Sequence, residues 1–483
     1  MATIAGRPGT HRGWLRTAVA VCAVALGTLG TQANAASGTA SASGTASASG
    51  TASASGTASA TGTASASGTA SATGAPAGAA ASGTASASGT ASATGTASAS
   101  GTASATGAPA GAAASGTASA SGPAVRADTP WKLRTPLSET VGQEFWAVAA
   151  TGARDAWTVG RTSDGTAGST PLIKHWNGTG WTDVPAASTG GRAARLDAVA
   201  AAAPDDAWAA GALDDGTSLV LQHWDGKKWR GVGHAAAPEG SLSFVGDIAA
   251  FGKSAWLTGF DWNPDSGAEV SYLERWTGSR WQRVSLPAAP GGGRVRPSDI
   301  TGTGPDDVWV SAEALTGEVA APLLYHWDGG GWTVREVPTP GEHPTGWTAG
   351  HAVATGRGSV YWIGKTNDAG VPQATMAAHW DGSRWRSLPA LPVDEANAAG
   401  ADGAGRLWVS GWAPGDRHSV SARWTGTTWV TETLPADVTE HSEMSTVLDI
   451  AGVPGTKGVF AAGTAGCASD PVQCGLLVSR GLG

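Results

Sequence analysis

The chain contains 24 tryptophans, whose flat apolar rings and single N–H donors can stack on a sugar or fill a core. Most of them recur at fixed places in a repeated sequence, where packing is the favoured role. Four others, Trp146, Trp262, Trp347 and Trp412, stand apart from those places. We therefore take these four as candidates for contact with a ligand.

Several polar residues near these tryptophans could orient a sugar beside their rings, because binding pockets combine apolar walls with a few convergent polar groups. The candidates are Asp261, Glu342, His343, Arg417 and His418. Together with the four tryptophans they form the predicted ligand-binding site. No catalytic residue is assigned to it.

Histidines raise the question of a metal site, because four of them share one place in the repeat. They are His175, His223, His326 and His379, and arginine takes the same place at Arg275 and Arg423. Each belongs to a different repeat, so the sequence predicts a structural role. We expect neither a metal nor another cofactor.

Catalysis would need residues outside the repeat. Carboxylates are paired at Asp214 with Asp215 and at Asp261 with Asp265, and a glycosidase needs two at a suitable distance. The sequence has no Gly-x-Ser-x-Gly, His-Glu-x-x-His or phosphate-binding loop. The favoured interpretation is a non-catalytic binding module for a carbohydrate or an extracellular protein. A glycoside hydrolase or lyase and a structural surface protein stay open as alternatives.

The elements that must position these residues are visible as a repeat. The sequence LQHWDGKKW at residues 221–229 returns in five near copies, spaced by 44 to 53 residues, as is typical of propellers. Apolar and polar residues alternate up to the first Trp, and Asp-Gly, Asn-Gly or Thr-Gly then supplies a tight reversal. This pattern predicts a β-hairpin.

A second signature occurs seven times between the hairpins, for example DDAWAAG at residues 205–211 and DDVWVSA at residues 306–312. A short run of small residues precedes each copy, which gives four strands in each unit. No stretch beyond residue 123 keeps a helical apolar period over the length of a helix. The sequence therefore predicts an all-β fold, a seven-bladed β-propeller with four-stranded antiparallel blades.

The two ends of the repeat are incomplete in complementary ways. The seventh unit has predicted strands at residues 446–452, 458–463 and 476–480 but no fourth strand, and residues 131–136 match a fourth strand without partners. We expect the N-terminal strand to close the ring in the last blade, because closure removes open sheet edges.

Loop positions predict which face of the ring binds. In an antiparallel blade the 1–2 and 3–4 turns share one end, and the 2–3 and 4–1 loops share the other. The turns are short and nearly constant, whereas the loops vary, and binding residues gather on variable loops held by a rigid frame. All four candidate tryptophans fall in or beside the variable loops.

The N-terminal third has a different composition. Residues 1–35 predict a secretory signal peptide, because arginines precede an apolar run that is too short to span a membrane. Residues 36–122 repeat SGTASA without charge or aromatic rings, which predicts a disordered tether. The propeller takes residues 123–483. We expect a secreted, extracellular protein, either free or attached to the cell wall, with no membrane insertion after signal removal.

The net charge excludes some classes of binding partner, and the number of cysteines predicts a disulfide. A formal net charge of −8 argues against nucleic acid and anionic membrane surfaces, and we expect a monomer. Cys467 and Cys474 remain after signal removal, an even number that predicts a disulfide in an exported chain. Closing a loop of about eight residues would contribute roughly 2.5 kcal/mol to stability.

The repeats also resemble those of known propellers. At Asp-Gly-x-x-Trp the unit resembles the Asp-box of bacterial neuraminidase-type propellers, Ser-x-Asp-x-Gly-x-Thr-Trp, with one residue fewer. The DDVW and HWDGxxW units are similar to those of secreted β-propeller proteins common in actinobacteria, most of them without an assigned activity. The resemblance covers residues 131–483 and implies the propeller fold without implying a ligand.

Overall fold

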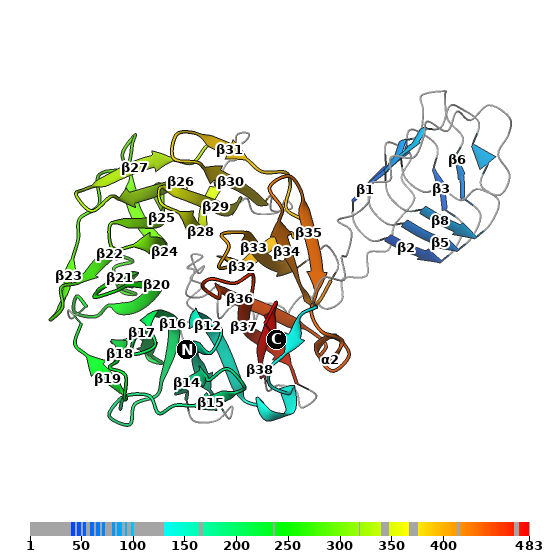
Figure 1. Cartoon of the computed structure of the whole chain (residues 1–483). Coiled ribbons are helices and arrows are strands. Elements are labelled where there is room, and N and C mark those ends of the chain that lie inside the picture. Colours follow the sequence, from blue (N-terminus) through cyan, green and yellow to red (C-terminus); the bar gives the residue numbers. More distant parts are fainter. Residues whose placement is uncertain are drawn as a thin grey trace, which may run out of the picture. The chain divides into compact units, whose positions relative to one another are not determined.

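The computed structural model describes residues 130–482, except 164–167, 235–236, 318, 340–346, 367–374, 413–415 and 468–472, together with short strands between residues 40 and 100. Pro130 to Leu482 form a ring of seven four-stranded antiparallel sheets (Figure 1). The seven-bladed propeller predicted from the repeat is therefore confirmed.

Each blade runs from an inner strand at the axis to an outer strand at the rim. Blade 1 comprises β12 (Gln143–Gly152), β13 (Asp155–Thr162), β14 (Thr170–Trp176) and β15 (Trp181–Asp183). Blade 2 comprises β16 (Ala194–Ala203), β17 (Asp206–Leu213), β18 (Leu219–Trp224) and β19 (Trp229–Val232). Blade 3 comprises β20 (Leu242–Phe251), β21 (Ser254–Trp262), β22 (Glu269–Trp276) and β23 (Trp281–Arg283). Blade 4 comprises β24 (Arg294–Gly304), β25 (Asp307–Thr316), β26 (Val319–Trp327) and β27 (Trp332–Glu336). Blade 5 comprises β28 (Trp347–Gly356), β29 (Ser359–Thr366), β30 (Thr375–Trp380) and β31 (Trp385–Ser387). Blade 6 comprises β32 (Glu395–Ala401), β33 (Leu407–Trp412), β34 (Ser419–Trp424) and β35 (Trp429–Thr433).

Blade 7 joins the two ends of the ring, as predicted. Its order is β11-β38-β37-β36, from β11 (Lys132–Leu133) to β38 (Gln473–Arg480), β37 (Val459–Gly466) and β36 (Ser445–Gly452). The closing strand is shorter than the predicted residues 131–136. Pairing continues only to the backbone N–H of Arg134, which donates to Leu477 at 2.8 Å, because Pro136 has no N–H and a 3₁₀ turn follows at Leu137–Glu139.

The hairpin turns owe their shape to one side chain. In blade 2 the Oδ1 atom of Asp225 accepts the backbone N–H groups of Lys227 and Lys228 at 3.0 and 2.9 Å, and Gly226 has a φ of 83°. Such an Asx turn reverses the chain locally, and glycine adopts positive φ without a steric cost. Asn177 makes the equivalent pair of bonds in blade 1.

The core lies between blades. The second-strand Trp157 of blade 1 packs against Trp224 and Trp229 of blade 2, with ring centroids 4.8 and 5.2 Å apart. Trp208 repeats this contact with Trp276 and Trp281 of blade 3 at 4.9 and 5.2 Å. The regular tryptophans therefore hold neighbouring blades together, which confirms the packing role predicted for them.

Every inner strand contains a bulge near its middle, such as that between Val245 and Asp247. The bulge brings a carbonyl close to the second strand. A Cβ on Gly411 would lie 1.7 Å from the carbonyl oxygen of Glu395, so this position requires glycine. The bulge also determines which side chain of the inner strand turns toward the axis.

The remaining described elements are small. Cys467 and Cys474 are joined in a disulfide, with their Cα atoms 5.4 Å apart, and α2 (Ala436–Thr439) is a single short helix. No helix among the described residues is long and apolar enough to span a membrane.

A second unit lies within residues 24–122, where ten short strands pair in parallel in three sheets, β1-β4-β7-β10, β2-β5-β8 and β3-β6-β9. Their bounds are β1 (Ala40–Ser43), β2 (Ala46–Ser49), β3 (Ala52–Ala54), β4 (Ala58–Thr61), β5 (Ala64–Ser67), β6 (Ala70–Ala72), β7 (Ala80–Ser82), β8 (Ala85–Ser88), β9 (Ser92–Ala93) and β10 (Ser98–Ser100). The predicted signal peptide lies outside the described residues.

Candidate functional site

The four candidate tryptophans all lie at one end of the blades. Trp146 and Trp347 are near the starts of first strands, and Trp262 and Trp412 end second strands. We call this end, where the 2–3 and 4–1 loops lie, the variable-loop face. The opposite end, with the 1–2 and 3–4 turns, is the constant-turn face.

Burial separates the four tryptophans into two pairs. The side chain of Trp146 is 2% exposed, and the guanidinium groups of Arg161 and Arg195 lie 5.1 and 6.0 Å from its ring. Trp347 is 3% exposed and packs in a core cluster with Trp309 and Trp362. Neither ring offers an open face to a sugar, because each is covered by neighbouring side chains that sequence position does not reveal.

Three predicted site residues meet beside Ser445 in blade 7. The half-buried ring of Trp412 donates its Nε1–H to the Ser445 carbonyl at 3.3 Å, and His418 Nδ1 lies 3.0 Å from the Ser445 hydroxyl. The carbonyl of Arg417, whose side chain is exposed, accepts the Ser445 N–H at 3.0 Å. These residues form a rigid polar corner between blades 6 and 7.

The other predicted residues do not join this corner. Trp262 and Asp261 belong to blade 3, and Asp261 is 1% exposed. Its carboxylate accepts from Ser243 at 2.9 Å and from Arg283 at 3.1 Å, which is an internal role. Glu342 and His343 lie outside the described residues. The seven predicted residues that the structure describes therefore lie in several blades, and three of them meet beside Ser445.

A buried charged cluster surrounds Asp261. Glu274 is fully buried, and its carboxylate lies 2.9 Å from His234 and 3.3 Å from Arg283. The neighbouring Tyr272 donates its hydroxyl to the Phe244 carbonyl at 3.0 Å. Burial, with the nearby carboxylates, raises the pKa of Tyr272 well above its ordinary value, so this phenol is poorly suited to act as a base.

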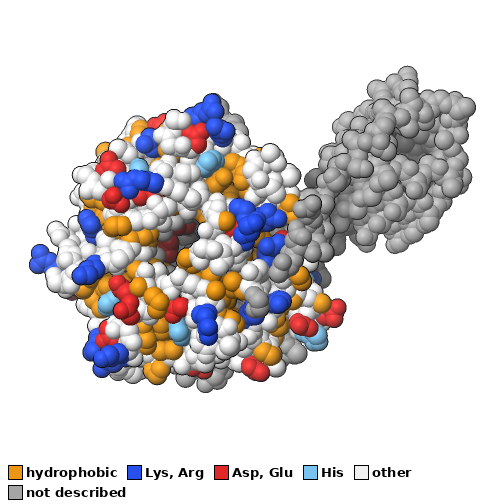
Figure 2. All heavy atoms as spheres, viewed as in Figure 1, with side chains coloured by type: hydrophobic (Ala, Val, Ile, Leu, Met, Phe, Trp, Pro, Cys, Tyr) orange, Lys and Arg blue, Asp and Glu red, His pale blue; other side chains and the backbone are white. Residues whose placement is uncertain are grey.

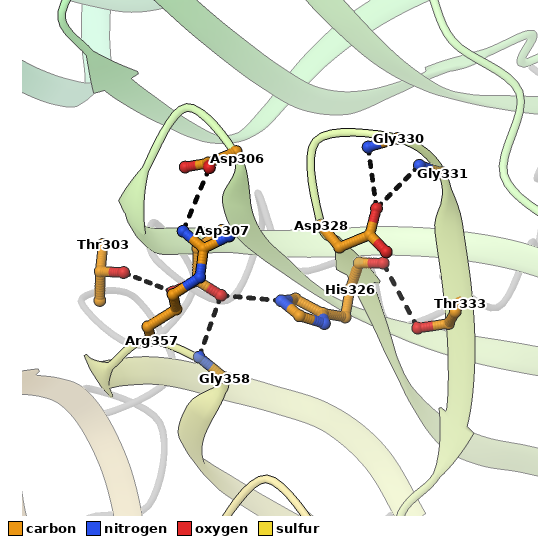
Figure 3. Close-up of polar contacts among 10 residues, drawn as sticks. All are labelled: Thr303, Asp306, Asp307, His326, Asp328, Gly330, Gly331, Thr333, Arg357 and Gly358. Atoms are coloured by element: carbon orange, nitrogen blue, oxygen red, sulfur yellow. Dashed lines mark hydrogen bonds and ion pairs between the residues drawn. The ribbon is translucent and has the colours of Figure 1, made fainter.

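Three of the four repeated histidines contact a carboxylate of their own blade, and Figure 3 shows the contact of His326 in blade 4. In blade 4, Asp307 lies 2.7 Å from His326 Nε2, accepts the Gly358 N–H of blade 5 at 3.2 Å and accepts the hydroxyl of Thr303. The His326 ring stacks on Trp309 at 3.9 Å. Burial raises the pKa of Asp307, but the bonds from Thr303, His326 and Gly358 outweigh burial and leave it below its ordinary value.

The same arrangement recurs around the ring. His175 pairs with Asp155 at 2.7 Å and His223 with Asp206 at 2.8 Å, whereas in blade 5 Ser359 takes the place of the carboxylate, 2.9 Å from His379. Each histidine is used within its own blade. Among the described residues no group of three or more His, Cys, Asp or Glu side chains is arranged to hold a metal ion.

A polar cavity of about 260 Å³ lies on the axis of the ring. Its lining comes from all seven inner strands, and its charged or titratable members are Asp247, Asp299, His351 and Asp449. Each of these four is the first paired residue after the bulge of its strand. The bulge therefore places equivalent side chains of four blades around one cavity.

The carboxylates in the cavity also connect neighbouring inner strands. Asp449 accepts the Val148 N–H at 2.8 Å, and Asp247 accepts the Ile300 N–H at 3.3 Å. Asp299 lies 3.1 Å from His351 Nδ1. Every one of these contacts crosses from a blade to the next, so the ring itself holds the acidic groups in place.

The lining of the axial cavity carries acidic side chains but no strongly basic ones. It includes three carboxylates, a histidine and the hydroxyl of Thr301, but no Lys or Arg. Carboxylates accept hydrogen bonds and can bind a hydroxyl or an ammonium group strongly. Sequence reasoning missed this cavity, although Asp-Ile recurs at Asp247, Asp299 and Asp449, at a position where blades 1, 2 and 6 have alanine.

A second cavity of about 480 Å³ is an open groove on blade 1. It is lined by the start of β14 and by the extended segment 183–191, and most of its walls are Pro, Ala, Leu and Val side chains. Its acidic member, Asp183, is paired with Lys174 at 2.6 Å. The axial cavity, with its convergent polar groups, is therefore the better candidate.

Comparisons with known proteins do not assign a family. No family model matches the chain, and no curated protein matches it. Among solved structures, that of YjhT is 13% identical with a TM-score of 0.39, and it covers 64% of this chain and 100% of its own. Two structures of a PL25 polysaccharide lyase, an ulvan lyase, have TM-scores of 0.42, with 11% and 10% identity. They cover 71% and 70% of this chain and 96% and 94% of their own, one of them with a bound glucuronic acid–sulfated rhamnose unit. The blade architecture accordingly rests on the strand pairing described above, and no family is assigned.

Proposed function

We propose that this protein is an exported, non-catalytic binding propeller that takes up a carbohydrate through its axial cavity. The observation that carries the proposal is the ring of Asp247, Asp299, His351 and Asp449 around that cavity. Small-molecule sites typically have volumes of roughly 300–1,000 Å³. A cavity of about 260 Å³ is near the lower limit, so it would accept one sugar unit or a side group of a longer glycan.

A carbohydrate suits this cavity because sugar hydroxyls can donate to fixed carboxylates. Preorganised acceptors bind with a smaller entropic cost than mobile ones, and these carboxylates are already held by contacts between blades. The half-buried rings of Trp262 and Trp412 lie on the variable-loop face and provide apolar surface near the loops. An extracellular protein partner is the competing ligand class.

The hydrogen bonds and the burial of the titratable groups favour binding over catalysis. The cavity carboxylates are committed to backbone N–H groups or to His351 of neighbouring strands. The phenol of Tyr272 is buried with a raised pKa. A glycosidase or lyase would need an acid or base that can exchange protons with its substrate.

The proposal is tested by a glycan array followed by calorimetry on the hits. We expect Ala399→Phe, which adds a ring to the cavity lining, to weaken binding by at least about tenfold, or about 1.4 kcal/mol. Ala153→Phe, on an exposed turn of the constant-turn face, is the matched control and should bind normally. His351→Gln provides a second, smaller change if the phenylalanine variant does not fold.

The same glycans test the enzymatic alternative. Prolonged incubation with each hit should leave it intact, as judged by product chromatography and by ultraviolet absorbance for an unsaturated lyase product. Turnover that disappears in Asp247→Asn would establish catalysis instead. Retention of full affinity in both cavity variants would place the ligand elsewhere on the ring.

A further inference from the structure

The loops of the variable-loop face carry an excess of negative charge. Among the described residues, the exposed carboxylates of the 2–3 loops are Asp214, Asp215, Asp265 and Asp416. Those of the 4–1 connections are Glu139, Glu239, Asp394, Asp437, Glu440 and Glu443. Against these ten stand two exposed guanidinium groups, Arg192 and Arg417. A partner that approaches this face therefore meets a negative potential.

The constant-turn face has the opposite balance. Its described 1–2 turns expose Arg154, Lys253, Arg357 and Lys457, and its 3–4 turns expose Lys227, Lys228, Arg280 and Arg384. The exposed carboxylates in these turns are Asp205, Asp306 and Asp328. Eight cations against three carboxylates make this face positive, so the described ring is electrically polar along its axis.

In the view of Figure 2, acidic and basic side chains are mixed over the rim of the ring. Lys and Arg side chains gather over β19, near β31 and over the region of β33 to β35, and acidic side chains are visible in the hollow at the centre. The lining of the axial cavity contains three aspartates and no Lys or Arg. Clefts lined by one sign of charge focus the field and raise the local concentration of the opposite charge.

We propose that the ligand of the axial cavity is a positively charged glycan, a polymer of amino sugars with free amines, which enters from the variable-loop face. This inference rests on the proposed function and adds the charge of the ligand to it. An ammonium group has three donors and a full charge, so it satisfies several fixed carboxylates better than a neutral hydroxyl does. The cavity size selects a single sugar unit or its amine over a folded protein surface.

The test uses three tetrasaccharides that differ at one carbon. Tetraglucosamine, tetra-N-acetylglucosamine and cellotetraose carry an amine, an acetamide and a hydroxyl at C2 of each unit. We expect calorimetry at pH 6 to give an affinity for tetraglucosamine at least about tenfold higher than for the other two. Raising the salt concentration should weaken only the charged ligand, because screening acts on the charge interaction.

Single and triple variants test which carboxylates interact with the charged ligand. Asp247→Asn, Asp299→Asn and Asp449→Asn each keep a carbonyl that can accept a hydrogen bond from the neighbouring strand, and each should weaken tetraglucosamine binding by about tenfold. On the loops, the triple variant Glu239→Gln, Asp265→Asn, Asp416→Asn should slow association by several-fold.

A charge-matched control removes three carboxylates from the constant-turn face, in Asp205→Asn, Asp328→Asn, Asp381→Asn. Asparagine suits such turns because Asn177 already forms one in blade 1. This control should leave both the affinity and the association rate unchanged. An equal loss in the control would show that only total charge matters and would overturn the assignment to the variable-loop face.

Each other outcome is also decisive. Tighter binding of cellotetraose or the acetylated tetramer, lost in the cavity variants, would overturn the charge preference and keep the proposed function. Tighter binding of tetralysine than of tetraglucosamine would replace the glycan by a basic peptide. Absence of binding by all three sugars and by the glycan array would overturn both proposals.

Discussion

At the scale of single residues, the polar side chains of the repeat serve structure first. The carboxylate of Asp307 is 1% exposed and connects blade 4 to blade 5 through the Gly358 N–H. The sequence places an Asp or Ser at this position in most units, but it does not show that the side chain also reaches a neighbouring blade. Such a buried acceptor is costly to remove, because its donors then lose their partner.

We predict that Asp307→Ala lowers the free energy of unfolding by about 2–4 kcal/mol, because Thr303, His326 and Gly358 lose a shared acceptor. Asp307→Asn, which keeps a carbonyl acceptor, should cost less. Urea unfolding followed by tryptophan fluorescence measures both. Equal stability of the alanine variant and the wild type would show that the network contributes nothing.

A second residue-scale prediction concerns pH. The Lys228 N–H, followed by the guanidinium of Arg230 and the Lys227 N–H, lowers the pKa of the Asp225 carboxyl to about 2. A carboxyl with a lowered pKa in the folded state contributes stability above its unfolded pKa of about 4, and this contribution is lost as the pH falls toward 2. Carbon-13 NMR of the carboxyl group should show a midpoint near 2. A midpoint near 4 would contradict the Asx turn.

At the scale of elements, ring closure depends on a very short strand. β11 has two residues, yet the preceding Trp131 is 3% exposed and packs edge-on against Trp408 of blade 6, with centroids 5.8 Å apart. Arg134 adds a side-chain bond to the Leu482 carbonyl at 3.0 Å. The closing contacts thus come as much from side chains as from backbone pairing.

We predict that deletion of residues 123–137 lowers the melting temperature by many degrees, because it exposes the edge of β38 and opens a cavity beside Trp408. Trp131→Ala, a smaller change, should cost about 3–5 kcal/mol. Deletion of residues 36–122 is the control and should leave melting unchanged. Calorimetry decides, and an unchanged melting temperature after the first deletion would refute closure by β11.

At the scale of the whole molecule, the propeller and the Ser/Thr/Ala/Gly segment differ in how much apolar side-chain area they contain. The ring buries large aromatic rings between blades, whereas β1 to β10 contain only Ala, Ser and Thr and are each two to four residues long. Paired strands repeat at an offset of 18 or 21 residues, as in Ala40 with Ala58 and Ala64 with Ala85. Such side chains bury little apolar area to offset chain entropy.

We predict that residues 36–122, expressed alone, give the narrow amide proton dispersion of a disordered chain in NMR spectra. Their removal should leave the affinity of the propeller for the proposed glycan unchanged, because the axial cavity draws its lining from the ring alone. Dispersed β-type shifts with slow amide exchange would show instead that the parallel sheets are stable in solution.

The sequence by itself determined the blades, because strand alternation, Asp-Gly reversals and the position of Trp are local signals that repeat with a fixed period. It also determined the closure, since the missing fourth strand and the unpartnered residues 131–136 complement each other. The disulfide partners, Cys467 and Cys474, followed from number alone, and they are bonded in the structure.

Only the tertiary structure decided which side chains are buried and which line the axial cavity. Trp146 and Trp347 are buried by side chains of other strands, so distance from the repeat did not imply exposure. The axial carboxylates depend on a one-residue bulge, which changes the side of the strand on which a side chain lies. Asp247 and Asp449 are about 200 residues apart in the chain, and closure of the ring brings them to one cavity. Neither burial nor convergence is a local property, which is why the sequence predicted the blades and missed the axial cavity.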